Sequence, residues 1–369
     1  MTAPLFVDIR SHFHILWALI SPPPLPRMFA HPYSGDDGSV ALLDMPVRQG
    51  RAASVKPDHC LQPVSVMGMF RTMRDQLRLV FIATRPFSLT AAIVPVVVGT
   101  LVAAEESFSP VRFLLALVGA IAIQSGTNLI NDYFDHIKGV DGPNTLGPAG
   151  LIQRNILAPR SVLLMGIAWF ALGIVIGLIL VAMTGPELLL LGLASVAAGF
   201  FYTAAPVSLA YIGLGELTVF LFMGPVIVTG AYYVQTEQWS WQPVIVSLPI
   251  AFLVTAILQA NNLRDVENDR EHGKRTLATL IGRRAATVEF GVLIGAAFVM
   301  LLILVLVDLA PWPVLAAALT APAAVKAVQL AARTTNPRAL NFVLLRTAML
   351  HMRFGLLFAA GLTVGLFVG

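Results

Sequence analysis

The sequence predicts an all-α, polytopic membrane protein with about nine transmembrane helices. Hydrophobic residues make up 57% of the chain and charged residues only 12%, and the mean hydropathy is +0.79. This composition lies far outside the range of soluble globular proteins. Apolar stretches that could cross a bilayer as helices, which takes about 20 residues each, recur along the chain. We expect the bilayer itself to be a partner and nucleic acid not to be one.

The first 68 residues differ in composition from the remainder. They contain the run Pro22-Pro-Pro24 and a polar segment at residues 34–38, and their apolar patch at residues 14–20 is too short to span a bilayer. The patch also lacks the basic flank and the cleavage site of a signal peptide. We therefore expect residues 1–68 to form a disordered N-terminal extension and residues 69–369 to form the transmembrane domain.

Nine apolar segments follow this extension. Proline interrupts several of them, at Pro95, Pro225 and Pro249, which helices packed in a membrane bundle tolerate. The predicted spans are residues 80–104, 112–133, 162–184, 187–203, 214–233, 243–264, 287–308, 311–331 and 350–368.

The distribution of basic residues supports this number of spans. If nine spans alternate, the basic residues that flank them gather almost entirely on the side of the N-terminus. The positive-inside rule then predicts a cytoplasmic N-terminus and an external C-terminus. We expect the protein to lie in the plasma or inner cell membrane. The opposite side carries Arg112 and five acidic residues, namely Glu105, Glu106, Glu187, Glu237 and Asp308.

Two polar stretches with the same spacing lie where the second and sixth spans end. The first is Asn128-Leu-Ile-Asn131-Asp132-Tyr-Phe-Asp135, and the second is Asn262-Leu-Arg-Asp265-Val-Glu-Asn-Asp269. Residues three and four apart share one face of a helix, so each stretch presents a stack of oxygen atoms. The match suggests an internal repeat whose two helices face each other across one cavity. Both stretches lead into loops predicted to be cytoplasmic, so we expect the chemistry on that face.

The composition of these stretches favours a magnesium site. Acidic side chains near membrane depth are costly and usually face a cavity or a cation, and the helix dipole disfavours them at a C-terminus. Mg²⁺ takes carboxylate and amide oxygens and is commonly shared with substrate phosphates. Because Cys60 is the single cysteine and no suitable Cys/His spacing is present, a disulfide framework and a zinc or copper site are disfavoured. A solvated helix end is the alternative, and two matching copies argue against it.

Basic residues follow both acidic stretches, at Lys138, Arg154, Lys274 and Arg275. They could bind diphosphate oxygens that the metal leaves uncovered; the alternative is that they serve only topology and contacts with lipid headgroups. There is no Walker-type glycine loop. A pocket of this kind suits a diphosphate head with a long hydrocarbon tail, such as a polyprenyl diphosphate, whose allylic cation an aromatic acceptor would capture.

Two motifs resemble those of a known family. Asn131-Asp-Tyr-Phe-Asp135 with Asp141, and Asp265-Val-Glu-Asn-Asp269, are similar to the two aspartate-rich motifs of the UbiA-type intramembrane prenyltransferases. The resemblance covers about residues 75–369. It implies nine transmembrane helices around a central cavity, in which Mg²⁺ is held between the two motifs. It also implies transfer of a prenyl chain from a polyprenyl diphosphate to an acceptor.

Within this family the chain most resembles the enzymes that prenylate 1,4-dihydroxy-2-naphthoate in menaquinone synthesis, which implies C-prenylation with loss of the acceptor carboxylate. An Arg-Thr-x-x-Arg-Pro-like segment, which follows the first motif in many other members, is absent; this disfavours chlorophyll, haem O or 4-hydroxybenzoate acceptors. Ala149 stands where this subgroup often carries a polar residue, so another quinone precursor such as homogentisate remains an alternative. The segments that carry the resemblance are residues 131–141, 147–153, 202–206, 213–216, 224–225, 232–235, 261–265 and 273–277.

The resemblance assigns roles to individual residues. The catalytic residues it implies are Asp132, Asp135, Asp265 and Asp269. The residues that would hold Mg²⁺ are Asn131, Asp135, Asp265 and Asp269. The residues that would bind the diphosphate or the small aromatic acceptor are Asn128, Lys138, Arg154, Tyr202, Asn262 and Lys274.

A cation-coupled transporter is the competing class of function. That class prefers ionisable residues near the bilayer centre on broken helices. Here the two acidic stretches lie at helix ends, so the sequence favours the enzyme.

Overall fold

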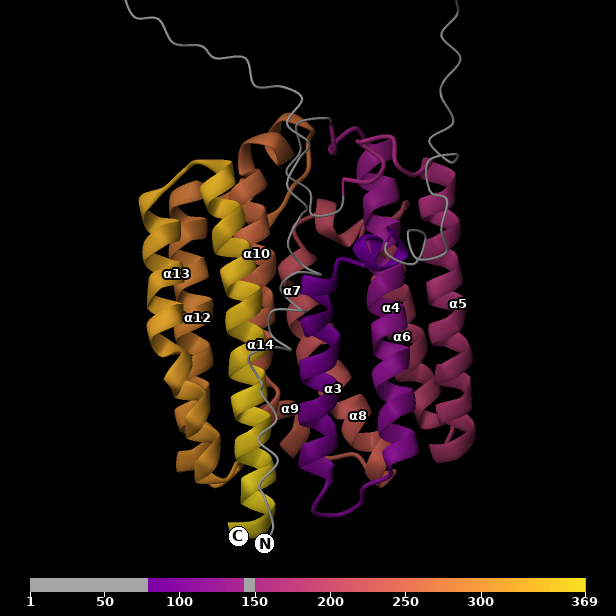
Figure 1. The fold of residues 1–369 in the computed structure, drawn as a ribbon, viewed down its shortest axis with the longest axis vertical. Helices are drawn as coiled ribbons and strands as arrows, with labels where there is room; N and C mark the ends of the chain where they lie inside the picture. The colour runs from indigo at the N-terminus through magenta and orange to yellow at the C-terminus, as the bar shows by residue number, and fades with distance from the viewer. Residues whose placement is uncertain (1–78, 143–149, 369) are drawn as a thin grey trace, which may run out of the picture. The chain divides into compact units, whose positions relative to one another are not determined.

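The computed structural model describes residues 79–142 and 150–368, and the named elements within these residues are all helical. The described residues belong to one compact unit, Pro63–Gly369. The all-α prediction is therefore confirmed (Figure 1). The predicted extension at residues 1–68 lies outside the described residues and stays a prediction.

Seven helical segments of the described chain are long and apolar enough to cross a membrane. Five of the predicted spans thus appear with few changes, the first appears in a shorter form and the last in a longer form. The seven are η2 and α3 (Pro86–Leu89, Thr90–Ala103), α4 (Pro110–Ile137), α5 (Pro159–Thr184), α7 with η4 and α8 (Gly215–Leu221, Phe222–Val226, Ile227–Thr236), α12 (Arg283–Leu306), η5 and α13 (Trp312–Thr320, Ala321–Arg333), and α14 (Pro337–Val368).

The two other predicted spans are helices as well. The fourth corresponds to α6 (Glu187–Phe201), which is short but apolar. The sixth corresponds to α9 (Gln242–Val246) and α10 (Leu248–Glu271), and the last turns of α10 carry the charged residues of the second acidic stretch. The protein is a multi-pass integral membrane protein, as predicted.

The first predicted span differs from the structure because the chain turns at Arg85. Residues 79–83 are helical, and the path breaks before Pro86. A proline disfavours helical geometry at the residue before it, and Arg85 adopts a left-handed conformation with φ 55°, which is uncommon for a side-chain-bearing residue. The turn directs the Arg85 side chain toward α4.

The last predicted span begins earlier than expected, at Pro337 instead of near residue 350. Polar residues such as Asn341 and Arg346 lower the hydropathy of this extra segment. It is nevertheless amphipathic, because Leu340, Leu344 and Thr347 share one buried helical face.

α4 and α10 end in the same way. Each is followed by a glycine of positive φ, Gly139 at 74° and Gly273 at 70°. The N–H group of the residue after each glycine donates to the carbonyl oxygen of Asp135 (3.0 Å) or Asp269 (2.8 Å). This is the Schellman arrangement of a helix C-terminus. Asp135 and Asp269 therefore occupy equivalent positions, which gives the predicted repeat a structural basis.

The C-terminal ends of α4 and α10 lie at the same end of the bundle, at the top of Figure 1. The loops at the opposite end hold the acidic residues expected there. Arg112 pairs with Glu237 at 2.6 Å, and Tyr232 donates to Glu106 at 2.6 Å. These charged groups thus lie at the end of the bundle opposite the two acidic stretches, as the charge pattern predicts.

A glycine allows α3 and α8 to pack closely. A Cβ atom on Gly99 would lie 2.2 Å from the carbonyl oxygen of Val228, which is rigid backbone on α8. Gly295 on α12, by contrast, has no atom near its Cβ position.

We predict that Gly99→Ala destabilises the protein by about 1–3 kcal/mol, because overpacking a close helix contact forces the backbones apart. Gly295→Ala is the matched control, and it should be neutral or slightly stabilising because alanine is the better helix former. Thermal unfolding in detergent measures both. Equal melting temperatures for the two variants would contradict the packing described here.

Candidate active site

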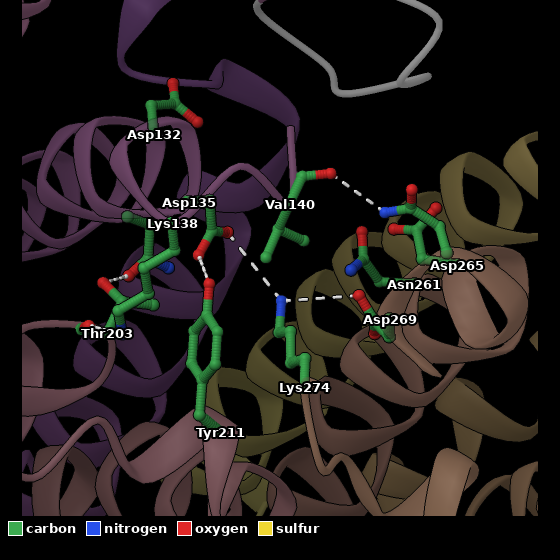
Figure 2. Close-up of polar contacts among 12 residues, drawn as sticks. Asp132, Asp135, Lys138, Val140, Thr203, Tyr211, Asn261, Asp265, Asp269 and Lys274 are labelled. Atoms are coloured by element: carbon green, nitrogen blue, oxygen red, sulfur yellow. Dashed lines mark hydrogen bonds and ion pairs between the residues drawn. The ribbon is translucent and has the colours of Figure 1, made fainter. Parts of the chain in front are cut away.

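The two acidic stretches meet at Lys274. Its Nζ atom lies 3.8 Å from Oδ2 of Asp135 on α4 and 3.8 Å from Oδ1 of Asp269 on α10. Figure 2 shows the ammonium group between the two carboxylates. The structure therefore brings together the two helix faces that the sequence predicts to lie opposite each other.

The local fold explains the reach of Lys274. This residue follows Gly273, so its backbone has turned back toward α10 and its N–H group is bonded to Asp269. Burial by itself would lower the pKa of the Lys274 ammonium, but the carboxylates of Asp135 and Asp269 raise it above its usual value. The lysine stays charged and neutralises the acids that face it.

Lys138 occupies a different position from Lys274. It is the last residue before Gly139, and its Nζ atom donates to the carbonyl oxygen of Thr203 (2.7 Å) and to Oγ of Ser208 (2.8 Å). Burial lowers the pKa of Lys138. Lys138 thus ties the end of α4 to the loop after α6, whereas Lys274 bridges the acids.

Tyr211 lies between the two lysines, and the sequence did not reveal it. Its hydroxyl group donates to Oδ1 of Asp135 at 2.5 Å, and its ring centre is 3.7 Å from Nζ of Lys138 and 5.1 Å from Nζ of Lys274. Such cation–π contacts favour charged ammonium groups. Tyr211 belongs to a short turn, η3 (Leu209–Tyr211), so no helical period or motif pointed to it.

Asn131 and Tyr202 contact the loop that covers the site. Oδ1 of Asn131 accepts a hydrogen bond from Oγ1 of Thr203 at 2.6 Å. Tyr202 ends α6, and burial together with the charge of Glu216 raises the pKa of its phenol. Both predicted residues border the same space as Asp135 and Lys274.

Asp132 and Asn128 instead hold the turn at Arg85. Asp132 forms an ion pair with Arg85 and lies apart from the Lys274 cluster in Figure 2. Nδ2 of Asn128 donates to the carbonyl oxygen of Thr84 (2.9 Å) and to Oγ of Ser88 (2.8 Å). These bonds position the Arg85 side chain at the polar end of the bundle.

Asp265 is held by the preceding residue on α10. Arg264 donates from Nε to Oδ1 (2.8 Å) and from Nη2 to Oδ2 (2.5 Å) of Asp265. Arg264 also donates to the side-chain oxygens of Asn341 on α14 (2.8 Å) and Asn261 (3.0 Å). Both oxygens of Asp265 therefore already have a guanidinium partner.

Asn262 and Asn268 of α10 make further contacts around the site, whereas the predicted residue Arg154 does not. Nδ2 of Asn262 donates to Oε1 of Glu216 at 2.7 Å. Nδ2 of Asn268 donates to the carbonyl oxygen of Val140 at 3.0 Å, which joins α10 to the turn after α4. Arg154 is exposed and does not border the cavity.

A cavity of about 440 Å³ begins beside these groups and continues between the helices. Its far part is apolar and reaches Leu180, Leu188 and Val234. Its walls come from α3, α4, α5, α6, α7, α8 and α10. The polar residues at its near end include Arg85, Asn128, Asn131, Asp135, Tyr202, Glu216, Asn262 and Lys274.

The carboxylate oxygens of Asp135 and Asp269 suit a hard cation that also coordinates other ligands. No three His, Cys, Asp or Glu side chains within residues 79–142 and 150–368 are close enough to hold a metal ion by themselves. Oδ2 of Asp269, however, is buried without a hydrogen-bond partner, and Oδ2 of Asp135 faces Lys274. Mg²⁺ usually takes one or two carboxylates and completes its shell with water and substrate phosphate, which matches this donor set.

We predict that Arg264→Gln lowers the free energy of unfolding by about 3 kcal/mol, because removing one partner leaves Asp265 as an unpaired, largely buried charge. Arg283→Gln is the matched control. Arg283 of α12 pairs with Glu267, which lies on α10 like Asp265. The Glu267 carboxylate is 61% exposed, so loss of this ion pair should cost about 1 kcal/mol or less. Thermal unfolding in detergent compares the two, and equal losses would contradict a structural role for the Arg264–Asp265 pair.

Comparison with known proteins identifies relatives over most of the chain. It is 34% identical over 286 residues to a 1,4-dihydroxy-2-naphthoate octaprenyltransferase of Bacillus subtilis, covering 77% of this chain and 92% of the relative. A protein of the same description from Mycobacterium tuberculosis is 35% identical, with 76% and 95% covered. A UbiA prenyltransferase domain-containing protein 1 homolog of Drosophila melanogaster is 32% identical, with 80% of each chain covered.

Solved structures share the fold at low sequence identity. A UbiA homolog from Aeropyrum pernix gives a TM-score of 0.58 at 17% identity, with 75% of this chain and 97% of that chain covered. A UbiA homolog from Archaeoglobus fulgidus, bound to DMAPP and Mg²⁺, gives a TM-score of 0.52 at 16% identity, with 77% and 99% covered. The model of the UbiA prenyltransferase family matches residues 92–365. The chain belongs to the UbiA prenyltransferase family.

Proposed function

We propose that this protein transfers a polyprenyl chain from a polyprenyl diphosphate to 1,4-dihydroxy-2-naphthoate, with loss of the acceptor's carboxylate. The observation that carries the proposal is the placement of Lys274 between Asp135 and Asp269, at the polar end of an apolar cavity. The similarity to the bacterial naphthoate octaprenyltransferases supports the acceptor. Membership of the prenyltransferase family favours this enzyme over a transporter.

The polar end suits the diphosphate. Lys274 and Arg85 border the cavity and would bind phosphate oxygens through charge-assisted hydrogen bonds. Lys138 stands beside them on the ring of Tyr211. An arriving diphosphate would replace the carboxylates as the partner of Lys274 and would free them for a cation.

Mg²⁺ would be held by Asp135 and Asp269, with Asn131 and Asp265 as further candidates. The solved homolog bound to DMAPP and Mg²⁺ supports this cofactor. When bound, the ion supplies positive charge that stabilises the departing diphosphate. The Arg264–Asp265 pair makes Asp265 available only if the guanidinium group shifts.

The apolar part of the cavity suits the hydrocarbon tail. Burying apolar groups there removes them from water, and the enclosed walls keep water from the allylic cation. Leu178 on α5 and Leu193 on α6 border the cavity and are more than half exposed. A chain longer than the cavity would therefore continue between α5 and α6 into the surrounding lipid.

We also infer that the site faces the cytoplasm. Lys138 and Lys274 lie at the site end of the bundle, and other basic residues of the chain follow α4 and α10 in the same loops. Basic residues favour the cytoplasmic side. The opposite end of the bundle carries Glu106 and Glu237.

A different aromatic acceptor is the second candidate, with the same fold and the same prenyl donor. The comparable similarity to the Drosophila protein, whose description names no acceptor, supports this alternative.

We predict that Asp135→Asn and Asp269→Asn each lower prenyl transfer at least about 100-fold, because a neutral amide removes the charge that would hold the cation. Glu267→Gln is the matched control. It removes an exposed carboxylate from α10 two residues before Asp269, and it should retain activity. Mg²⁺-dependent transfer of a labelled polyprenyl chain in membranes measures all three. Full activity in either aspartate variant would refute the site assignment.

We predict that a panel of acceptors gives product with 1,4-dihydroxy-2-naphthoate and that the product lacks the carboxyl group. Mass spectrometry detects this as an adduct lighter by one CO₂ than simple prenylation. Homogentisate serves as the comparison. Faster turnover of homogentisate, or a naphthoate product that keeps its carboxyl group, would refute the naphthoate assignment and leave the prenyltransferase assignment intact.

A further inference from the structure

Glu216 is a buried carboxyl group with one unused oxygen at the polar end of the cavity. It lies in the first turn of α7 and is 6% exposed. Oε1 accepts the hydrogen bond from Nδ2 of Asn262 at 2.7 Å. Oε2 is buried and has no hydrogen-bond partner among the described residues. Burying a hydrogen-bond acceptor without a partner costs free energy, so such a group in a folded protein calls for an explanation.

Glu216 and the residues around it border one cavity. Tyr202 and Lys274 border the same cavity and interact electrostatically with this carboxyl group. The hydroxyl group of Tyr202 lies against Gly215, where an added Cβ atom would be 3.2 Å from it. Glu216 therefore borders the same cavity as an aromatic side chain, Tyr202, and as a cation at the polar end, Lys274.

We propose that Glu216 is a catalytic residue that accepts the hydroxyl proton of the aromatic acceptor through Oε2. This inference rests on the proposed prenyl transfer to a hydroxylated ring. An aromatic hydroxyl group is a donor that would satisfy the unused oxygen, and a ring bound beside Tyr202 would lie in the same cavity as the prenyl tail. General-base catalysis of this kind typically contributes about 10²–10⁴ in rate.

The proton and electron pairs balance in this step. The hydroxyl proton passes to Oε2, and the freed electron pair increases the nucleophilicity of the adjacent ring carbon. That carbon bonds to C1 of the prenyl chain while the C1–O bond breaks and the diphosphate leaves with the electron pair. The carboxylate on the same ring carbon departs as CO₂, its electron pair restores the aromatic ring, and Glu216 returns the proton to the ring oxygen.

A purely structural role for Glu216 is separable from this one. Glutamine at position 216 keeps an acceptor for Asn262 but cannot take up a proton. The chain also offers a matched control in Glu289 on α12, which accepts a hydrogen bond from Gln259 of α10 at 2.8 Å. Glu289 does not border the cavity and interacts with Glu216 only through its charge. Glu289→Gln therefore removes a nearby carboxyl group that cannot contact the acceptor.

The test measures transfer by wild type, Glu216→Gln, Glu216→Asp and Glu289→Gln to acceptors of increasing hydroxyl acidity. For a weakly acidic acceptor we expect Glu216→Gln to lower kcat about 100-fold while the KM for polyprenyl diphosphate stays unchanged. The ratio of wild-type to variant kcat should approach one as the acceptor becomes ionised in solution. Glu216→Asp, which keeps a carboxylate, should retain more activity than the glutamine variant. Glu289→Gln should behave as wild type.

Two outcomes overturn the inference. One is full activity in Glu216→Gln, and the other is a loss that is the same for every acceptor, since that pattern marks Glu216 as a support for Asn262. Thermal unfolding and Mg²⁺-dependent binding of the polyprenyl diphosphate confirm that each variant is folded. A wild-type protein that transfers no prenyl chain to any aromatic acceptor refutes the proposed function itself, and that result is distinct from both.

Discussion

Buried carboxylates in an apolar bundle need positive partners, and this requirement organises the polar end of the protein. Asp135 and Asp269 share Lys274, Asp265 is held by Arg264, and Asp132 pairs with Arg85. An unpaired charge at this depth would be costly. The pairings differ in kind, because Arg264 binds both oxygens of Asp265, whereas Lys274 lies 3.8 Å from each of its partners. The looser contact is the one that an anionic ligand can replace.

The helix ends determine which groups can meet. Gly139 and Gly273 allow the chain to turn back after α4 and α10, so the loops that follow return over the last helical turns. The loop after α6 also lies against the end of α4, because Lys138 and Asn131 form hydrogen bonds with Thr203. These backbone turns enclose the site at one end of the cavity. The apolar walls beyond it come from helices that also face lipid.

The site therefore has two chemical environments in one space. The cations and carboxylates form one part, which suits a diphosphate with its metal ion. Tyr202, Glu216 and the apolar walls form the other, which suits a ring and a hydrocarbon chain. Glu216 lies where they adjoin, with one oxygen bonded to Asn262 and the other unused. Separating the charge of the leaving group from the acceptor in this way favours reaction between the two substrates over reaction with water.

The sequence by itself determined the membrane helices, the equivalence of Asp135 and Asp269, and the family. Hydropathy identifies the membrane-spanning segments, helical spacing shows which residues share a helix face, and sequence motifs indicate the family. All three are local properties of the chain. Only the tertiary structure decided which side chains pair with one another. A lysine follows each acidic stretch in the sequence, yet Lys138 lies before its glycine and Lys274 after it, so they contact different groups. Tyr211 and Arg85 reach the site from distant segments, and the pairing of Asp265 with Arg264 depends on side-chain direction. Contacts across helices depend on how the helices pack, which no local pattern in the chain specifies.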